Sequence, residues 1–170
     1  MVNEIARLLK EHGAVRFGDF VLASGARSSY YMDIKSVVTD PAVLSAIAAA
    51  VARKFSFEVV AGVAVGGVPL AVAVSLASGK PFAIVRSQEK SHGREGKVIG
   101  QVKGRQVLLV EDVTTSGDSA VLGARALRDE GAVVDTVVTV VDRGAGAEVS
   151  LRRHALELVA LATAAEILEA

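Results

Sequence analysis

The sequence predicts an α/β fold, with a mostly parallel sheet flanked by helices. Short apolar runs rich in valine and leucine alternate with longer segments of helical character along most of the chain. Such alternation produces parallel strands joined by crossover helices that cover both faces of a sheet. A length of 170 residues and a hydrophobic content of 51% suit one domain with a substantial core.

The predicted elements follow one another with no obvious linker, internal repeat or low-complexity segment. The N-terminal helix is amphipathic and ends at Gly13, Asp40 is the N-cap of the next helix, and Thr163 and Glu166 form a capping box for the last one. In chain order we expect a helix near 3–12, extended pieces near 15–22 and 29–34, a helix at 41–54, a strand at 59–65, a helix at 68–78, a strand at 81–86, a polar loop at 87–100, a strand at 106–111, a helix at 118–130, a strand at 133–141, a short helix near 147–153, a strand at 156–162 and the capped helix.

Charge and composition exclude several classes of function. Nineteen basic and nineteen acidic residues leave no net field that would attract nucleic acid. The absence of cysteine excludes disulfides, a thiolate nucleophile and a cysteine-based zinc site. The N-terminus reads as a helix and not as a signal peptide, so we expect a cytoplasmic protein.

One uncharged segment, Val59 to Gly79, is long enough to be considered as a membrane span. Gly62, Gly66, Gly67 and Pro69 interrupt it. A break inside a lipid-exposed helix would leave backbone groups without hydrogen bonds. We therefore predict a buried strand, a tight glycine turn and a helix, and no membrane partner.

The most informative motif is VLLVEDVTTSGDSA, which covers residues 107–120. Its apolar part predicts a strand buried on both faces, and the hydroxyl- and glycine-rich part leads into a helix, where backbone N–H groups hold phosphate well. Glu111 and Asp112 would repel a phosphate unless they accept hydrogen bonds from sugar hydroxyls or work beside Mg²⁺. A P-loop is excluded because no lysine follows Lys103. An ordinary strand-to-helix turn remains the alternative interpretation.

Two further loops are expected to meet this motif. Residues 66–69, 111–119 and 142–144 all follow predicted strands, and in such sheets ligands bind beyond the carboxyl ends of the strands. Arg143 could grip a carboxylate or carbonyl with its planar guanidinium, or could simply pair with Asp142. The loop 87–100 carries Lys90 and His92 and is either a solvated hairpin tip or a cationic lid over a polyphosphate.

Five segments together resemble the orotate phosphoribosyltransferases, a family of type I phosphoribosyltransferases, in the shorter form typical of archaeal members. The 107–120 motif resembles the phosphoribosyl-diphosphate signature of the whole superfamily, and the SG…YY and R…K.HG segments indicate the orotate enzymes much more sharply. The segments are FVLASGARSSYYMDIK (20–35), AGVAVGGVPLA (61–71), RSQEKSHG (86–93), VLLVEDVTTSGDSA (107–120) and VVDRGAG (140–146).

The resemblance implies a type I phosphoribosyltransferase fold in one domain, with a small N-terminal hood over residues 1–35 and a core over 36–170. It implies transfer of ribose 5-phosphate from 5-phospho-α-D-ribose 1-diphosphate (PRPP) to orotate, which forms orotidine 5′-phosphate and diphosphate in UMP biosynthesis. It also implies Mg²⁺ chelated by the substrate, with no metal ligand directly from the protein, and a homodimer in which the lid loop 87–100 enters the neighbouring site.

The same resemblance assigns roles to individual residues. The catalytic residues would be Lys90, His92 and Asp112. PRPP would be bound by Arg86, Lys90, His92, Glu111, Asp112, Val113, Thr114, Thr115, Ser116, Gly117, Asp118 and Ser119. Orotate would be bound by Thr115, Arg143, Tyr31 and Met32.

Three lysines of the commoner bacterial pattern are replaced, because Ala23, Gly66 and Ser87 stand at their positions. The roles of those lysines therefore do not transfer, and fewer cations are left to neutralise the diphosphate. Two alternatives stay open: a phosphoribosyltransferase for another nucleobase, and a catalytically silent, nucleotide-sensing relative. A binder has little need of a cationic lid, which favours the enzyme.

Overall fold

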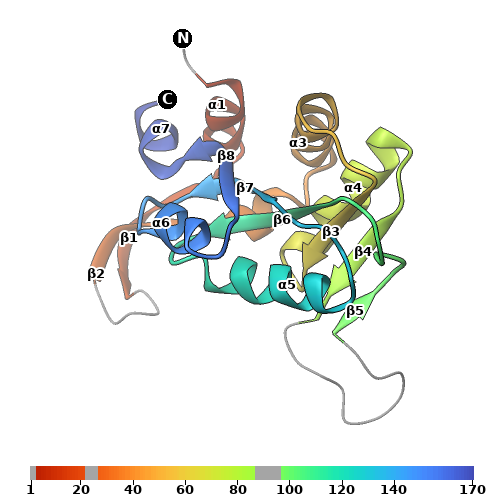
Figure 1. Ribbon diagram of the computed structural model, residues 1–170. Coiled ribbons are helices and arrows are strands. Elements are labelled where there is room, and N and C mark those ends of the chain that lie inside the picture. The colour runs from red at the N-terminus through yellow and green to blue at the C-terminus, as the bar shows by residue number, and fades with distance from the viewer. Residues whose placement is uncertain (1–2, 22–26, 87–96) are drawn as a thin grey trace.

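The computed structural model describes residues 3–21, 27–86 and 97–170. A six-stranded sheet in the order β5-β4-β3-β6-β7-β8 forms its centre (Figure 1). Five strands are parallel, and β5 alone runs antiparallel, beside β4. The strands are β3 (Val59–Val63), β4 (Phe82–Val85), β5 (Val98–Ile99), β6 (Val107–Thr114), β7 (Thr136–Asp142) and β8 (Glu157–Thr163). The predicted mostly parallel α/β fold is confirmed.

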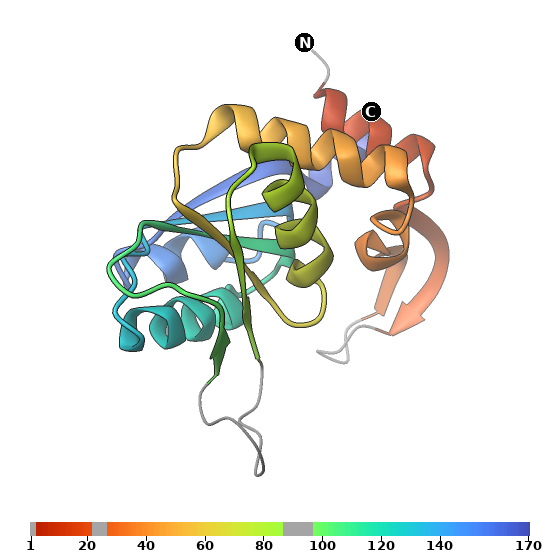
Figure 2. The ribbon, with the colours of Figure 1, turned by 90° about the vertical axis from the view of Figure 1, so that its right-hand side faces the viewer.

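Helices cover both faces of this sheet and enclose two separate clusters of buried side chains. One cluster combines residues of α1 (Glu4–Glu11), α3 (Pro41–Lys54), α4 (Gly67–Ser78) and α7 (Ala164–Glu169). The other combines residues of α5 (Asp118–Asp129) and α6 (Ala147–Arg152) with the opposite face. Figure 2 shows α3 and α4 on one side of the strands and α5 on the other. Two-sided burial explains why β3 is apolar at every position.

A separate antiparallel ribbon, β1 (Val15–Val21) with β2 (Arg27–Met32), lies beyond the carboxyl ends of β6 and β7 (Figure 1). Its register shifts between Phe17 and Phe20, where one bulge interrupts the pairing. The rings of Phe20 and Tyr31 lie 5.7 Å apart across the ribbon. A short helix, α2 (Ile34–Val37), follows β2 and returns the chain to the main sheet.

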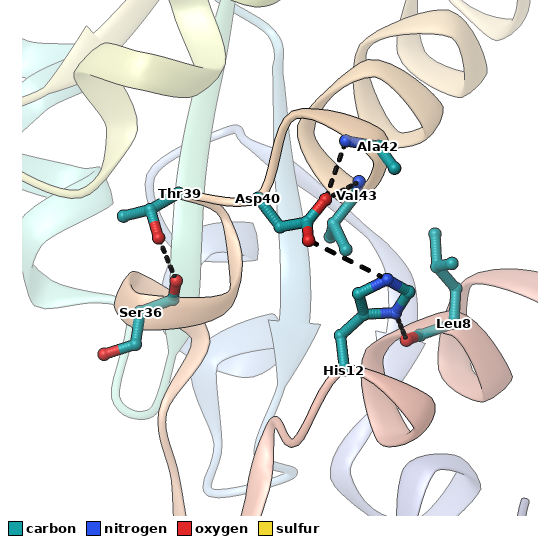
Figure 3. Close-up of polar contacts among 7 residues, drawn as sticks. All are labelled: Leu8, His12, Ser36, Thr39, Asp40, Ala42 and Val43. Atoms are coloured by element: carbon teal, nitrogen blue, oxygen red, sulfur yellow. Dashed lines mark hydrogen bonds and ion pairs between the residues drawn. The ribbon is translucent and has the colours of Figure 1, made fainter.

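Polar contacts surround Asp40, where the start of α3 lies near the end of α1 (Figure 3). The carboxylate of Asp40 accepts hydrogen bonds from two backbone amides in the first turn of α3, which makes it the predicted N-cap. The Nε2 atom of His12 lies 4.0 Å from this carboxylate, and its Nδ1 is 2.9 Å from the carbonyl oxygen of Leu8. The hydroxyl of Thr39 donates to the carbonyl of Ser36 in the adjoining turn. Of these contacts only the one between His12 and Asp40 joins the two helices, and the buried side chains of Ala6 and Leu9 pack α1 against the core.

Several element boundaries differ from the predicted ones. β6 continues to Thr114, because its hydrogen-bonded ladder with β7 includes the acidic positions and reaches Asp142. β3 ends at Val63, where the glycine turn begins, and β7 begins only at Thr136. The predicted polar loop 87–100 contains β5 at its end, and α2 was not predicted.

The uncharged segment 59–79 is divided between β3 and the twelve-residue α4, as the sequence predicts. Within the described residues, no helix is long and apolar enough to cross a membrane.

Candidate active site

Two acidic residues lie buried near the carboxyl end of β6. The exposed fractions are 5% for Glu111 and 6% for Asp112, and both residues belong to a strand whose other positions are almost all buried. Successive side chains of a strand point to opposite faces, and both residues nevertheless line the same cleft at the end of β6. Burying charge in this way costs stability, which is typical of a functional position.

The carboxyl group of Glu111 has an unusual environment. Its Oε1 atom is buried and has no hydrogen-bond partner among the described residues. Burial and, second, the charge of Asp112 raise the pKa of Glu111 from 4.5 to about 8, while the charge of Lys35 acts in the opposite direction. Glu111 is therefore mostly protonated near neutral pH before a substrate binds.

Asp112 packs against the turn between β3 and α4. A side-chain carbon at Gly66 would collide with the Asp112 carboxyl group, and one at Gly62 would collide with the backbone of Gly67. Glycine is therefore required at Gly62, where the obstacle is backbone, and a side chain at Gly66 would have to displace the Asp112 carboxyl group. The turn and the acidic strand end form one continuous surface.

The predicted phosphate loop connects β6 to α5. A cavity of about 270 Å³ is lined by Glu111 and by residues 113–120. Gly117, with a φ of 83°, is the N-cap of α5 and contributes no side-chain cap, so the first amides of the twelve-residue helix face the loop. The hydroxyl of Ser116 donates to Asp118 at 2.8 Å. Backbone amides and hydroxyls at a helix start form a site suited to phosphate.

The main cleft adjoins this loop and has a volume of about 280 Å³. It combines residues from β2, α2, the β3–α4 turn, the end of β6, the phosphate loop and the residue after β7. The lining residues are Tyr31, Met32, Asp33, Ile34, Lys35, Val63, Ala64, Val65, Gly66, Glu111, Asp112, Val113, Thr115, Ser119 and Arg143.

Arg143 reaches the cleft because its backbone continues the ladder between β6 and β7. Its N–H donates to the carbonyl of Thr114 at 3.0 Å. Asp142, the alternative partner considered for Arg143, accepts hydrogen bonds from the Thr114 hydroxyl and from the N–H of Gly144, both at 3.2 Å. Asp142 thus fixes the two strand ends, and the guanidinium of Arg143 contributes to the lining of the cleft.

The structure brings most of the predicted site residues together. Tyr31 and Met32 line the cleft from the ribbon, and Met32 is buried while Tyr31 is 44% exposed. Arg86 is not among the lining residues; it follows β4, and its N–H donates to the carbonyl of Lys97, the residue before β5. The predicted catalytic residues Lys90 and His92 lie outside the described residues.

Comparisons with known proteins decide the family. Residues 33–157 match the phosphoribosyl transferase domain family. An orotate phosphoribosyltransferase of Methanoculleus marisnigri is 61% identical over 169 residues, which cover 99% of each chain. The chain belongs to the orotate phosphoribosyltransferase family.

Solved structures of orotate phosphoribosyltransferases share the fold. The crystal structure of the Aeropyrum pernix orotate phosphoribosyltransferase is 38% identical, with a TM-score of 0.83 over 97% of this chain and 96% of that one. The Mycobacterium tuberculosis H37Rv orotate phosphoribosyltransferase in complex with PRPP is 29% identical, with a TM-score of 0.77 over 97% of both chains. The predicted family and fold are confirmed.

Some residues of this orotate phosphoribosyltransferase cleft were missed by the sequence analysis. Asp33, Ile34 and Lys35 line it, although no role was predicted for them. They follow the YYM segment directly, so their place at the end of a family-specific motif was the available signal. No group of three or more histidine, aspartate or glutamate residues within the described ranges could hold a metal ion.

Proposed function

We propose that this protein transfers ribose 5-phosphate from PRPP to N1 of orotate, and releases orotidine 5′-phosphate and diphosphate. The observation that carries the proposal is the single cleft in which the acids of β6, the phosphate loop, Tyr31 and Arg143 meet. A sugar phosphate needs an anion site beside hydroxyl acceptors, and orotate needs a cation and a flat surface. Full-length relatives named for this activity support the same conclusion.

The donor lies along the end of β6 in this proposal. The backbone amides and hydroxyls of residues 113–119 hold its 5′-phosphate at the start of α5. Glu111 and Asp112 hold the ribose hydroxyls, and the unpartnered oxygen of Glu111 accepts one of these hydrogen bonds. Binding then satisfies a buried polar atom that has no hydrogen-bond partner among the described residues.

Orotate lies between the ribbon and the end of β7. Arg143 binds its carboxylate or a ring carbonyl through charge-assisted hydrogen bonds. The Tyr31–Met32 segment packs along the ring, and Thr115 contributes a hydroxyl at the boundary with the phosphate loop. A base without a carboxylate would leave the guanidinium without its partner, which favours orotate over uracil.

Displacement at the anomeric carbon passes through a cationic, oxocarbenium-like sugar, so catalysis consists of positioning and of stabilising separated charge. No protein nucleophile is required. In this proposal Arg86, Lys90 and His92 stabilise the departing diphosphate, and Asp112 stabilises the sugar as positive charge develops.

Mg²⁺ fits the chemistry of this site. The buried carboxyl groups of Glu111 and Asp112 are hard oxygen ligands of the type that Mg²⁺ prefers, and one of their oxygens lacks a partner within the described residues. Mg²⁺ usually keeps several waters and binds through substrate phosphates. We propose that the substrate's own oxygens hold it, where it neutralises diphosphate charge, while the two acids orient the chelate.

We further propose a homodimer in which the lid loop 87–100 enters the neighbouring site. Mixing two variants of very low activity, Lys90→Ala and Asp112→Asn, tests this arrangement. A mixed dimer would contain one site with both residues intact, so random exchange should restore about a quarter of the wild-type activity. Activity that stays absent after verified subunit exchange would contradict a shared site.

A screen of bases tests the proposed substrate. Purified protein is incubated with PRPP, Mg²⁺ and either orotate, uracil, adenine or hypoxanthine, and the nucleotide product is separated by chromatography. We expect orotidine 5′-phosphate and diphosphate in equal amounts from orotate alone. A nucleotide from another base would indicate the alternative transferase, and PRPP binding without any product would indicate the silent relative. The cytoplasmic location remains a prediction.

A further inference from the structure

The short helix α2 places a lysine at the main cleft. The carboxylate of Asp33 caps this helix by accepting a hydrogen bond from the N–H of Ser36 at 3.2 Å. Asp33 also forms an ion pair of 2.8 Å with Arg16 of β1, and its N–H donates to the carbonyl of Ala14 at 2.8 Å. Three contacts therefore fix the start of α2, and Lys35 follows two residues later in the lining of the cleft.

Positive charge is scarce in this cleft. Among its described lining residues, the basic ones are Lys35 and Arg143, and the acidic ones are Asp33, Glu111 and Asp112. Both proposed substrates are anions, and PRPP carries several negative charges. An anionic ligand beside two buried carboxyl groups requires compensating cations, because repulsion is only weakly screened away from water.

The glycine turn of this chain supplies no further cation. Gly66 stands where the bacterial pattern has a lysine, and even a Cβ atom there would collide with the carboxyl group of Asp112. Lys35 lines the same cleft as Gly66 and Asp112, but it belongs to a different element, the helix α2. The charge missing from the turn can therefore be provided from this helix.

We propose that Lys35 binds an anionic oxygen of a substrate, either in the diphosphate of PRPP or in the carboxylate of orotate. This inference rests on the proposed function and adds a binding residue to it. A lysine is suited to the task because its ammonium group offers three donors on a flexible stem and can follow a polyphosphate. The cap of α2 fixes the backbone from which Lys35 lines the cleft.

The charge of Lys35 also acts on Glu111, because it lowers the pKa of that carboxyl group. Removal of Lys35 should therefore raise the pKa of Glu111 further. If the ionised form of Glu111 binds the ribose, the acidic limb of the pH profile of kcat/KM should move to higher pH in a Lys35→Ala variant. This displacement tests the proximity of the Lys35 charge to Glu111, and the KM values test its contact with a substrate.

The test compares Lys35→Ala and Lys35→Arg with Lys103→Ala, which removes the same charge from an exposed turn before the other end of β6. Steady-state kinetics are measured with each substrate varied in turn, and thermal unfolding is recorded for every variant. Loss of one charge-assisted contact should raise the KM of the substrate concerned by roughly ten- to a hundredfold. Lys35→Arg should recover most of the affinity, and Lys103→Ala should match the wild type.

The measurements with PRPP and with orotate show which substrate Lys35 contacts. A higher KM for PRPP, with weaker binding of inorganic diphosphate in calorimetry, identifies the diphosphate; a higher KM for orotate identifies the carboxylate. Unchanged KM values for both substrates in Lys35→Ala would overturn the inference, as would a fall in kcat that accompanies a lower unfolding temperature and no change in KM. If the wild type fails to transfer to orotate, the proposed function fails. Calorimetry with diphosphate and orotate then decides the role of Lys35 by itself.

Discussion

Replacing Glu111 with glutamine removes an ionisable group from the buried end of β6 and preserves the shape of the side chain. Glu111 is 5% exposed, and one of its oxygens has no hydrogen-bond partner among the described residues. The amide of glutamine cannot ionise, so it never carries the buried charge. The change therefore isolates the contribution of this one carboxylate to stability.

The magnitude follows from the pKa of Glu111, which is raised from 4.5 to about 8 in the folded protein. Between these two values the folded state binds the proton more tightly than the unfolded state, so this group lowers the free energy of unfolding as the pH rises. The pKa difference corresponds to about 5 kcal/mol as an upper bound, and water that reaches the ionised group reduces this to about 2 to 5 kcal/mol. The glutamine variant has no carboxyl group to ionise at this position, so its free energy of unfolding does not fall for this reason. The difference in the free energy of unfolding between the variant and the wild type should therefore grow by about 2 to 5 kcal/mol from about pH 5 to about pH 9.

The assay is urea unfolding followed by circular dichroism at about pH 5, 7 and 9, without ligand. The control is Glu130→Gln, at an exposed carboxylate next to the C-terminus of α5. Stability curves of the control and the wild type should run parallel across this range. If the Glu111→Gln curve also runs parallel to the wild type, the carboxyl group is not buried in the way described, and the reasoning about its ionisation is refuted.

Three other substitutions test separate parts of the structure. Arg143→Ala should raise the KM for orotate by roughly ten- to a hundredfold and change the KM for PRPP little, because the lost contact belongs to the base; equal changes in both values would refute that role. Gly66→Ala should displace the Asp112 carboxyl group. The displacement should lower kcat/KM by about a hundredfold and the free energy of unfolding by about 1 to 3 kcal/mol. Wild-type kinetics in this variant would contradict the close packing of the turn against Asp112. Thr163→Ala should remove the cap of α7 and lower the free energy of unfolding by about 0.5 to 2 kcal/mol in urea titrations; altered KM values would show a coupling to the cleft that we do not expect.

Much of the fold was predictable because its signals are local in sequence. The apolar run of β6, the glycine turn before α4 and the capping box of Thr163 with Glu166 each depend on neighbouring residues. The predicted end of β6, at residue 111, was wrong because the polar residues from Asp112 onward were interpreted as a loop. Pairing with β7 instead carries the strand through Glu111 to Thr114.

The remaining features depend on contacts between distant parts of the chain. β5 has two residues and is defined only by its pairing with β4, for which no sequence pattern is long enough. The place of Lys35 beside the acids of β6 depends on the return of the chain through α2, so the spacing of residues could not reveal it. Lys90 and His92 lie outside the described residues, so their roles stay predictions.

Loss of the ultraviolet absorbance of orotate, on mixing with PRPP and Mg²⁺, tests the central claim most directly. We expect absorbance to fall with the wild type, to stay constant when the metal is chelated, and to fall far more slowly with Lys90→Ala at unchanged folding stability. Constant absorbance with folded wild-type protein that still binds PRPP would contradict the claim that this cleft transfers ribose 5-phosphate to orotate.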